Sequence, residues 1–248
     1  MTTIVDSVRS VLSDHTGTGF AYRVDLRLRP YGRSGTLVPS ESMLEQYYTT
    51  HAASWEHQAL IKLRPIAGDF AAGEALVERL HAIAFSKPRG DAIREGIRGM
   101  RTRGVKRHNS PLRGADVKNG VGGLRDVEFL IQGLQLEHAD QLTSRVDGNT
   151  VNAIGQLASA GILEPADAAA IREDYLYLRR VEHYLQLLEN RQIHSIPGPI
   201  EEIETLARRL HGYRAEAREF ETALQSTAAR VRARFERYVS PAEGQAAE

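Results

Sequence analysis

The stretch from Gly19 to Pro30, GFAYRVDLRLRP, holds the residues best suited to chemistry. Polar and apolar side chains alternate along it, which predicts a β-strand that ends at the proline. The polar face carries one carboxylate among three guanidinium groups: Arg23, Asp25, Arg27 and Arg29. A carboxylate on a strand can bind Mg²⁺, and arginines beside it can bind a polyphosphate. The pattern indicates phosphoryl or nucleotidyl transfer, and it leaves open a surface strand with cross-strand ion pairs.

A second informative stretch runs from Asp116 to Phe129, DVKNGVGGLRDVEF. Lys118 stands in an extended piece that leads through glycines into an amphipathic helix, with Asp126 in the first turn. Glycines before a helix can present N–H groups to a phosphate. Their spacing fits neither the P-loop nor the dinucleotide-binding fingerprint. From the local sequence alone, a plain turn into a helix is the favoured interpretation.

Positive charge is concentrated between Arg94 and Arg113, where seven Lys/Arg residues accompany one acidic residue, Glu95. This asymmetry indicates either an anionic partner or a solvated helix face followed by a loop. The segment has no interleaved aromatic residues, which disfavours single-stranded nucleic acid as the partner.

Composition limits the class of protein. The chain has 248 residues, a net charge of zero and no cysteine. Bulk charge therefore argues for neither nucleic acid nor a membrane as partner, and disulfides, thiolate zinc sites and cysteine nucleophiles are ruled out. No apolar run approaches membrane-spanning length and no secretory signal is recognisable, so we expect a cytoplasmic protein.

The periodicities predict an α+β, mostly helical fold. The first part mixes helices (2–13, 40–50, 52–60) with strands at 19–30, 36–38 and 61–66, the last carrying Lys62 and Arg64 on its polar side. Trp55, Ala59 and Leu60 are expected to face the core. Helices then follow at 71–85, 91–104, 124–136, 150–160, 165–191, 200–210 and 215–239. We expect a first domain over 1–70, a helical bundle over 71–240 and a disordered tail over 241–248.

Several motifs occur in one order along nearly the whole chain. They are Gly19–Pro30 with Gly32 and Gly35, Trp55–Lys62, Gly68-Asp69, Val117-Lys118, Gly122–Phe129 with Gln132, Tyr175–Leu188, and Leu206–Leu210. This set resembles the glutamine synthetase adenylyltransferase family. The number of separate motifs in one order makes the resemblance specific.

The resemblance implies a partial polymerase-β-type nucleotidyltransferase sheet followed by a helical bundle. It implies transfer of AMP to a tyrosine of glutamine synthetase, or its phosphorolytic removal, in the regulation of nitrogen assimilation. Mg²⁺ and ATP, or phosphate and ADP, are the implied cofactors, and a PII signal protein is the implied regulator. Asp25 would be the catalytic residue and metal ligand. The residues that would contact phosphate are Arg23, Arg27, Arg29, Lys62 and Lys118. The segment Leu178–Glu182 and the Lys118/Arg125 pair favour the adenylyl-removing half, whereas Trp55–Gln58 suits the transferase half equally well.

The sequence departs from this superfamily's catalytic pattern. Three carboxylates on neighbouring strands normally bind two metal ions, and Asp25 matches only the third. Upstream of it stand Asp6 and Asp14, with no Gly-Ser turn and no Asp-x-Asp pair. One hypothesis is therefore a truncated or degenerate enzyme, weak or inactive by itself, whose uncovered apolar surface promotes self-association. The rival hypothesis is a non-catalytic module that docks on glutamine synthetase or a PII protein. A nucleic-acid nucleotidyltransferase is a third hypothesis, disfavoured by the Trp55 and Gly122 motifs.

Overall fold

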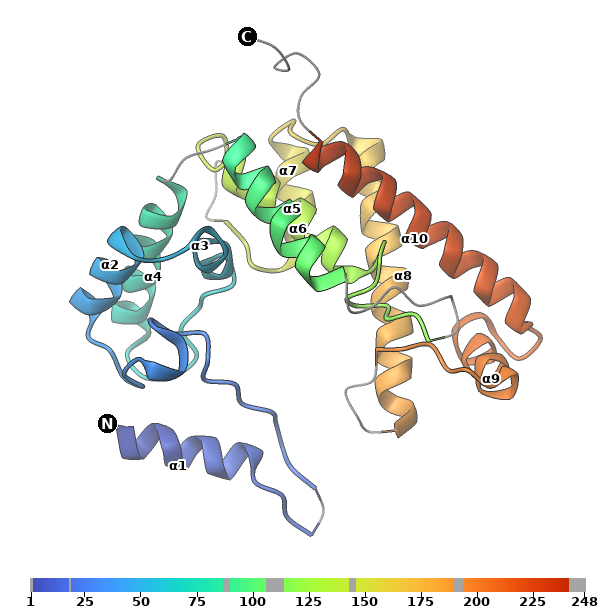
Figure 1. Ribbon diagram of the computed structural model, residues 1–248, viewed down its shortest axis with the longest axis horizontal. Coiled ribbons are helices and arrows are strands. Elements are labelled where there is room, and N and C mark those ends of the chain that lie inside the picture. The colour runs from blue at the N-terminus through green and yellow to red at the C-terminus, as the bar shows by residue number, and fades with distance from the viewer. Residues whose placement is uncertain are drawn as a thin grey trace. The chain divides into compact units, whose positions relative to one another are not determined.

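The computed structural model describes residues 2–17, 19–86, 90–105, 114–142, 146–189 and 194–240. Within these ranges the protein consists of ten α-helices and one 3₁₀ turn, with no β-strand (Figure 1). The elements are α1 Thr2–Ser13, η1 Gly32–Ser34, α2 Glu41–Thr50, α3 Ser54–Leu60, α4 Phe70–Phe85, α5 Asp91–Val105, α6 Leu124–Glu137, α7 Thr150–Ser159, α8 Pro165–Glu189, α9 Ile200–His211 and α10 Ala217–Val239. The predicted α+β class is therefore wrong, and the described chain is all-α.

The three predicted strands are the source of this error. Residues 20–27 are irregular, and the only nearby ladder contact in the described chain is an isolated bridge between Thr16 and Gly19. Residues 36–38 and 61–66 are not strands either. A strand persists only when a neighbouring strand pairs with its N–H and C=O groups. Among the described residues no neighbour does so, and alternation alone cannot supply one.

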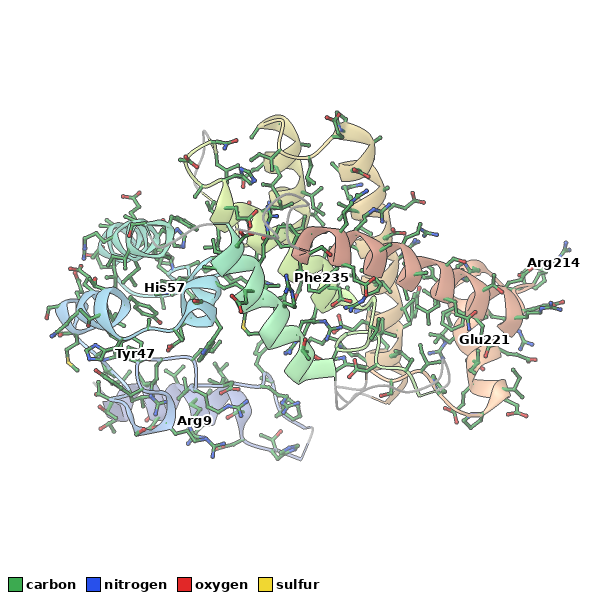
Figure 2. The ribbon with its side chains drawn as sticks, turned by 45° about the horizontal axis from the view of Figure 1, so that its top comes forward. Arg9, Tyr47, His57, Arg214, Glu221 and Phe235 are labelled. Atoms are coloured by element: carbon green, nitrogen blue, oxygen red, sulfur yellow. The ribbon has the colours of Figure 1, made fainter. Side chains whose placement is uncertain are left out.

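The chain divides into two compact units, one of residues 1–60 with 64–86 and the other of residues 61–63 with 87–248. In the first unit α4 packs against α2 and α3. The buried side chains of this unit include Tyr47, Tyr48, His57, Leu80 and His81, and Figure 2 labels Tyr47 and His57.

Side-chain caps explain where two helices of the first unit begin. The Ser40 hydroxyl accepts a hydrogen bond from the Met43 N–H, and Asp69 accepts one from the Ala72 N–H, 3.0 Å away. Each cap satisfies a backbone donor that the first helical turn leaves without a partner.

The buried face of α3 differs in part from the expected one. Leu60 is buried as expected, but the other buried residues are His57 and Gln58, whereas the side chains of Trp55 and Ala59 are exposed. The His57 Nε2 lies 2.8 Å from the Tyr48 carbonyl oxygen. A histidine that pairs with a backbone carbonyl can occupy the core without an unpaired polar group.

Helix α1 forms as predicted but buries none of its residues. Its apolar residues Ile4, Val8 and Val11 are 62%, 53% and 81% exposed. One backbone hydrogen bond, from the Tyr22 N–H to the Leu12 carbonyl, joins the chain after the helix back to it. Exposed apolar stripes of this kind favour association, so self-association remains a prediction.

The second unit is built around α6, which packs against α5, α7, α8 and α10. Eleven of its residues are buried, because other helices cover it on several sides. Gly133 lets the neighbours approach, since a Cβ at this position would lie 2.2 Å from the Tyr238 hydroxyl and 2.8 Å from Ile97 Cδ1. From α10, Phe235 (labelled in Figure 2) enters the same core.

The helices of the second unit follow the predicted boundaries closely. Asn149 caps α7, and Gly161, with φ of 72°, follows its end. Pro165 is the first residue of α8. The predicted stripe of α8 is buried at Ile171, Tyr175, Leu178, Val181 and Leu185. Local capping and helical spacing were sufficient to place these elements.

Candidate functional site

Asp25 and Arg27 lie together in the irregular segment of the first unit. The Arg27 Nε and Nη2 donate to the Asp25 carboxylate, with Nη2 2.5 Å from Oδ2, and the Arg27 backbone N–H donates to Oδ1 at 3.0 Å. The side-chain hydrogen bonds from Arg27, followed by the one from its backbone, lower the pKa of Asp25 to about 2. Both side chains are more than half exposed. The carboxylate is therefore ionised and already neutralised by its neighbour.

The Arg29 side chain forms hydrogen bonds within its own loop. Its guanidinium donates to the carbonyl oxygens of Leu26, Arg33 and Gly35, the last two at 3.3 Å. These bonds close the chain around η1. Arg23 is exposed on the same segment. Arg27 and Arg29 therefore both have structural partners within this segment.

The two predicted lysines belong to the second unit, and each pairs with a carboxylate. Lys62 Nζ lies 3.5 Å from Glu128 Oε1, and Lys118 Nζ lies 3.5 Å from Glu182 Oε1. The lysine side chains are 46% and 36% exposed. A phosphate would compete with these carboxylates for the ammonium groups.

The described residues do not by themselves fit a magnesium site. No group of three or more His, Asp or Glu side chains in the described ranges is placed to bind a metal. Both Asp25 oxygens already accept hydrogen bonds from Arg27. Mg²⁺ prefers six oxygen ligands in an octahedral arrangement, and one carboxylate paired with an arginine does not provide it. Asp25 as a metal ligand stays a prediction.

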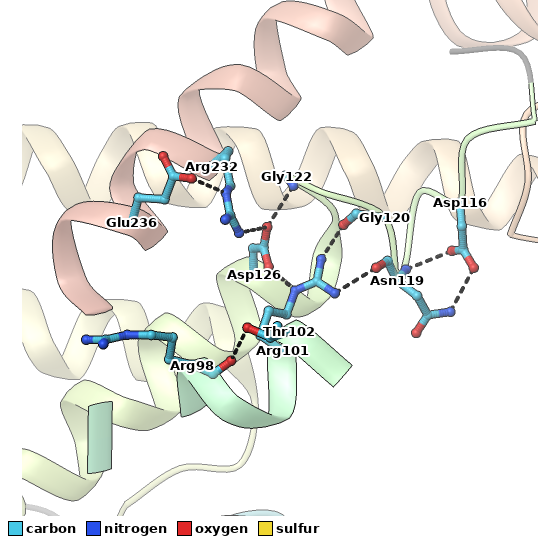
Figure 3. Close-up of polar contacts among 10 residues, drawn as sticks. All are labelled: Arg98, Arg101, Thr102, Asp116, Asn119, Gly120, Gly122, Asp126, Arg232 and Glu236. Carbon is cyan, nitrogen blue, oxygen red and sulfur yellow. Dashed lines mark hydrogen bonds and ion pairs between the residues drawn. The ribbon is translucent and has the colours of Figure 1, made fainter. Parts of the chain in front are cut away.

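The most deeply buried polar cluster joins α5, α6 and the glycine-rich turn (Figure 3). Arg101 is 3% exposed and Asp126 is fully buried. The Arg101 Nε donates to Asp126 Oδ1, Nη1 donates to the Asn119 carbonyl at 2.7 Å, and Nη2 donates to the Gly120 carbonyl. The other Asp126 oxygen accepts the Gly122 N–H at 2.7 Å, and Arg232 Nη1 lies 3.8 Å from it.

This cluster determines what the glycine-rich turn does. The backbone N–H groups of residues 118, 119, 120, 122, 123, 124 and 125 all donate to acceptors within residues 116–126. A phosphate cradle needs N–H groups that point outward without partners. These N–H groups of the turn therefore have acceptors within the turn, and two of its carbonyls accept hydrogen bonds from Arg101.

Gly122 is required at the point where α10 crosses this turn. Its φ is 70°, and a Cβ at this position would lie 2.1 Å from the backbone carbonyl oxygen of Ala228. A side chain would both strain the left-handed backbone and collide with a helix backbone that cannot rotate away.

Glu182 is the centre of a second cluster at the edge of the bundle. Its buried carboxylate lies 2.5 Å from Arg179 Nη1 and 3.3 Å from His194 Nδ1, in addition to Lys118. Burial, followed by the Lys118 charge, lowers the pKa of His194. The imidazole is therefore neutral at neutral pH, and its Nδ1 forms no hydrogen bond within the described residues.

Sequence reasoning missed both buried clusters. It placed Asp126 in the first turn of its helix, where the dipole favours an acidic residue, but it did not pair the carboxylate with Arg101. It noted Arg179 and Glu182 only as part of a motif. An acidic residue within an apolar helix was the available signal, because buried carboxylates need a partner. Residues 106–113 of the basic stretch and the tail 241–248 lie outside the described residues.

Two family models match the chain, one over the helical second unit and one over the first 79 residues. Residues 91–239 match the family model described as GlnD PII-uridylyltransferase, and the chain belongs to this family. Residues 1–79 match the model described as glutamate-ammonia ligase adenylyltransferase.

The chain is homologous to enzymes named bifunctional glutamine synthetase adenylyltransferase/adenylyl-removing enzyme. The relative from Stenotrophomonas maltophilia (strain K279a) is 36% identical over 96% of this chain and 25% of its own length. Those from Xanthomonas campestris (strain B100) and Streptomyces avermitilis are each 37% identical, over 93% and 87% of this chain and 24% and 21% of their own lengths. The resemblance given by the motifs is thereby confirmed. The chain spans about a quarter of the length of these relatives.

No helix in the described ranges is both long enough and apolar enough to cross a bilayer.

Proposed function

We propose that this chain takes part in adenylyl exchange on glutamine synthetase, in the cytoplasm, as part of the regulation of nitrogen assimilation. The observation that carries the proposal is 36% identity over 96% of the chain to a relative named for both adenylyl transfer and adenylyl removal. In the removing direction, a phosphate oxygen attacks the phosphorus of the AMP group. The bond to the tyrosine oxygen breaks, tyrosine regains its proton, and ADP leaves.

The proposed roles of residues follow from their charges. Asp25 is the catalytic carboxylate, and the exposed Arg23 contacts the phosphates of ATP or ADP. Arg27 and Arg29 keep the segment that carries Asp25 in shape through their hydrogen bonds to it. Lys62 and Lys118 reach a phosphate only by leaving Glu128 and Glu182.

A docking role without catalysis is the second candidate function. It is favoured because Arg27, Lys62 and Lys118, which would contact phosphate in the enzyme, are each paired with a carboxylate of the chain itself. In this role the helical bundle binds glutamine synthetase or a PII protein, and adenylyl chemistry is done elsewhere. The functional division into residues 1–70 and 71–240 belongs to the same proposal.

Two assays on the purified chain separate these candidates. The first mixes it with adenylylated glutamine synthetase, phosphate and Mg²⁺ and measures ADP, with the reverse reaction started from ATP and unmodified enzyme. Turnover that Asp25→Asn abolishes, and that the matched exposed change Asp167→Asn leaves intact, establishes catalysis.

The second assay measures binding of the chain to glutamine synthetase and to a PII protein by calorimetry, without nucleotide. Binding without turnover establishes the docking role. If the chain shows no turnover in the first assay and no binding in the second, the proposed function as a whole is refuted.

A further inference from the structure

The outer face of α8 carries a hollow that no role proposed above uses. Helix α8 buries Leu178, Val181 and Leu185, and its opposite side faces away from the bundle core. An open depression runs along that side, and the described residues that line it all belong to α8. Figure 1 shows α8 as a long, continuous helix of the second unit.

The lining of this hollow is positively charged, although the whole chain has no net charge. It contains the three arginines Arg172, Arg179 and Arg180 against a single carboxylate, Glu173. Arg172 and Arg180 are exposed, and neither forms an ion pair within the described ranges. Arg179 pairs with Glu182 but remains 50% exposed. The charge excess is therefore available to a partner.

Apolar side chains accompany the charges on the same side of the helix. Leu176 and Tyr184 line the hollow and are half-buried, and Leu187, at the following turn, is 60% exposed. Residues three, four, seven or eight positions apart share one helix face. The face therefore combines apolar anchors with a cationic rim.

We propose that this face of α8 binds an acidic amphipathic helix of a partner protein. From Arg172 to Leu187 the helix rises about 22 Å, which matches a partner helix of about 15 residues. The partner's carboxylates pair with Arg172 and Arg180, and its apolar stripe covers Leu176 and Leu187. A nucleic acid or a free phosphate would satisfy the guanidinium groups but would leave the leucines in water. This inference does not depend on adenylyl chemistry.

The test uses a fluorescein-labelled peptide of 15 residues, built from Glu, Leu and Ala with leucines at helical spacing. Its matched control has Lys in place of every Glu. Binding to the full chain is measured by fluorescence anisotropy at low and at physiological salt. The double variant Arg172→Gln/Arg180→Gln removes the unpaired cations. The double variant Arg209→Gln/Arg218→Gln removes two exposed cations from α9 and α10 and serves as the charge-matched control.

We expect the acidic peptide to bind and the basic peptide not to bind. The α8 double variant should lose at least tenfold in affinity, the α9/α10 control variant should change less than twofold, and Leu187→Ser should also weaken binding. Equal binding by both double variants would overturn the proposal. So would displacement of the peptide by tripolyphosphate at equimolar concentration, which indicates a simple anion site. Self-association that the α8 double variant alone abolishes would assign the face to a second copy instead.

Discussion

Replacement of Arg101 by methionine tests the buried cluster at the centre of the second unit. The change removes the cation that is paired with Asp126 inside the protein, where the two side chains are 3% and 0% exposed. After it, the carboxylate keeps one backbone N–H at 2.7 Å and the Arg232 guanidinium at 3.8 Å. The carbonyls of Asn119 and Gly120 lose the Arg101 guanidinium as a donor, although the Gly120 carbonyl keeps the Gly123 N–H at 3.1 Å.

The expected loss is large. Removing one partner of a buried ion pair costs about 3–5 kcal/mol, because a charge is left in a medium of low polarity. That is a large part of the roughly 5–15 kcal/mol that holds a typical domain folded. The control is Arg208→Met, which removes an exposed ion pair to Glu204 on α9 and should cost less than about 0.5 kcal/mol.

The assay is equilibrium urea unfolding followed by far-ultraviolet circular dichroism. The single tryptophan, Trp55, lies in the first unit and does not report on this cluster directly. A double variant, Arg101→Met/Asp126→Leu, should be less destabilised than the sum of the two single variants, because the second change removes the charge left unpaired. If Arg101→Met lowers the free energy of unfolding no more than Arg208→Met does, the Arg101–Asp126 cluster does not stabilise the turn.

Three further predictions follow from the geometry. Gly122→Ala should lower the free energy of unfolding by more than about 2 kcal/mol through strain and collision with α10. The control Gly155→Ala, whose new Cβ has no atom within 4 Å, should be neutral or stabilising. Equal effects of the two changes in urea unfolding would contradict this prediction. Arg27→Gln should raise the pKa of Asp25 from about 2 toward its usual value of 3.8, as measured by NMR titration, and an unchanged pKa would show that the ion pair does not form. Because the pKa of His194 is lowered in the folded chain, the unfolded chain binds more protons than the folded one below about pH 6.5. The free energy of unfolding should therefore fall as the pH drops below about 6.5. His194→Gln should flatten this pH dependence, and an unaltered slope would assign the pH dependence to other groups.

Local sequence was sufficient for much of the helical architecture. The boundaries of α1, α4, α7 and α9 lie within one residue of those predicted from caps, apolar spacing and helix-ending glycines. These signals act over a few residues, so they can be recognised without knowing what the helix packs against. The order of the motifs was likewise sufficient to identify the relatives.

The sequence was misleading where structure depends on distant partners. The alternation from Gly19 to Pro30 resembles that of a strand, but the described residues provide no neighbour to pair with it. Trp55 was expected in the core together with Leu60, yet α3 buries His57 and Gln58 beside Leu60 and leaves Trp55 exposed. The packing of α4 decides that orientation, and the α3 sequence alone does not.

The sequence by itself therefore determined the helices and the family of this chain. Helices depend on residues that are close together in the sequence, and the family is recognised from the order of the motifs. Only the tertiary structure decided which charges are buried and paired. Arg101 and Asp126 are separated by 25 positions, and the free energy of their interaction depends on the exclusion of water by the helices around them. That exclusion arises from packing, which no local pattern of residues specifies.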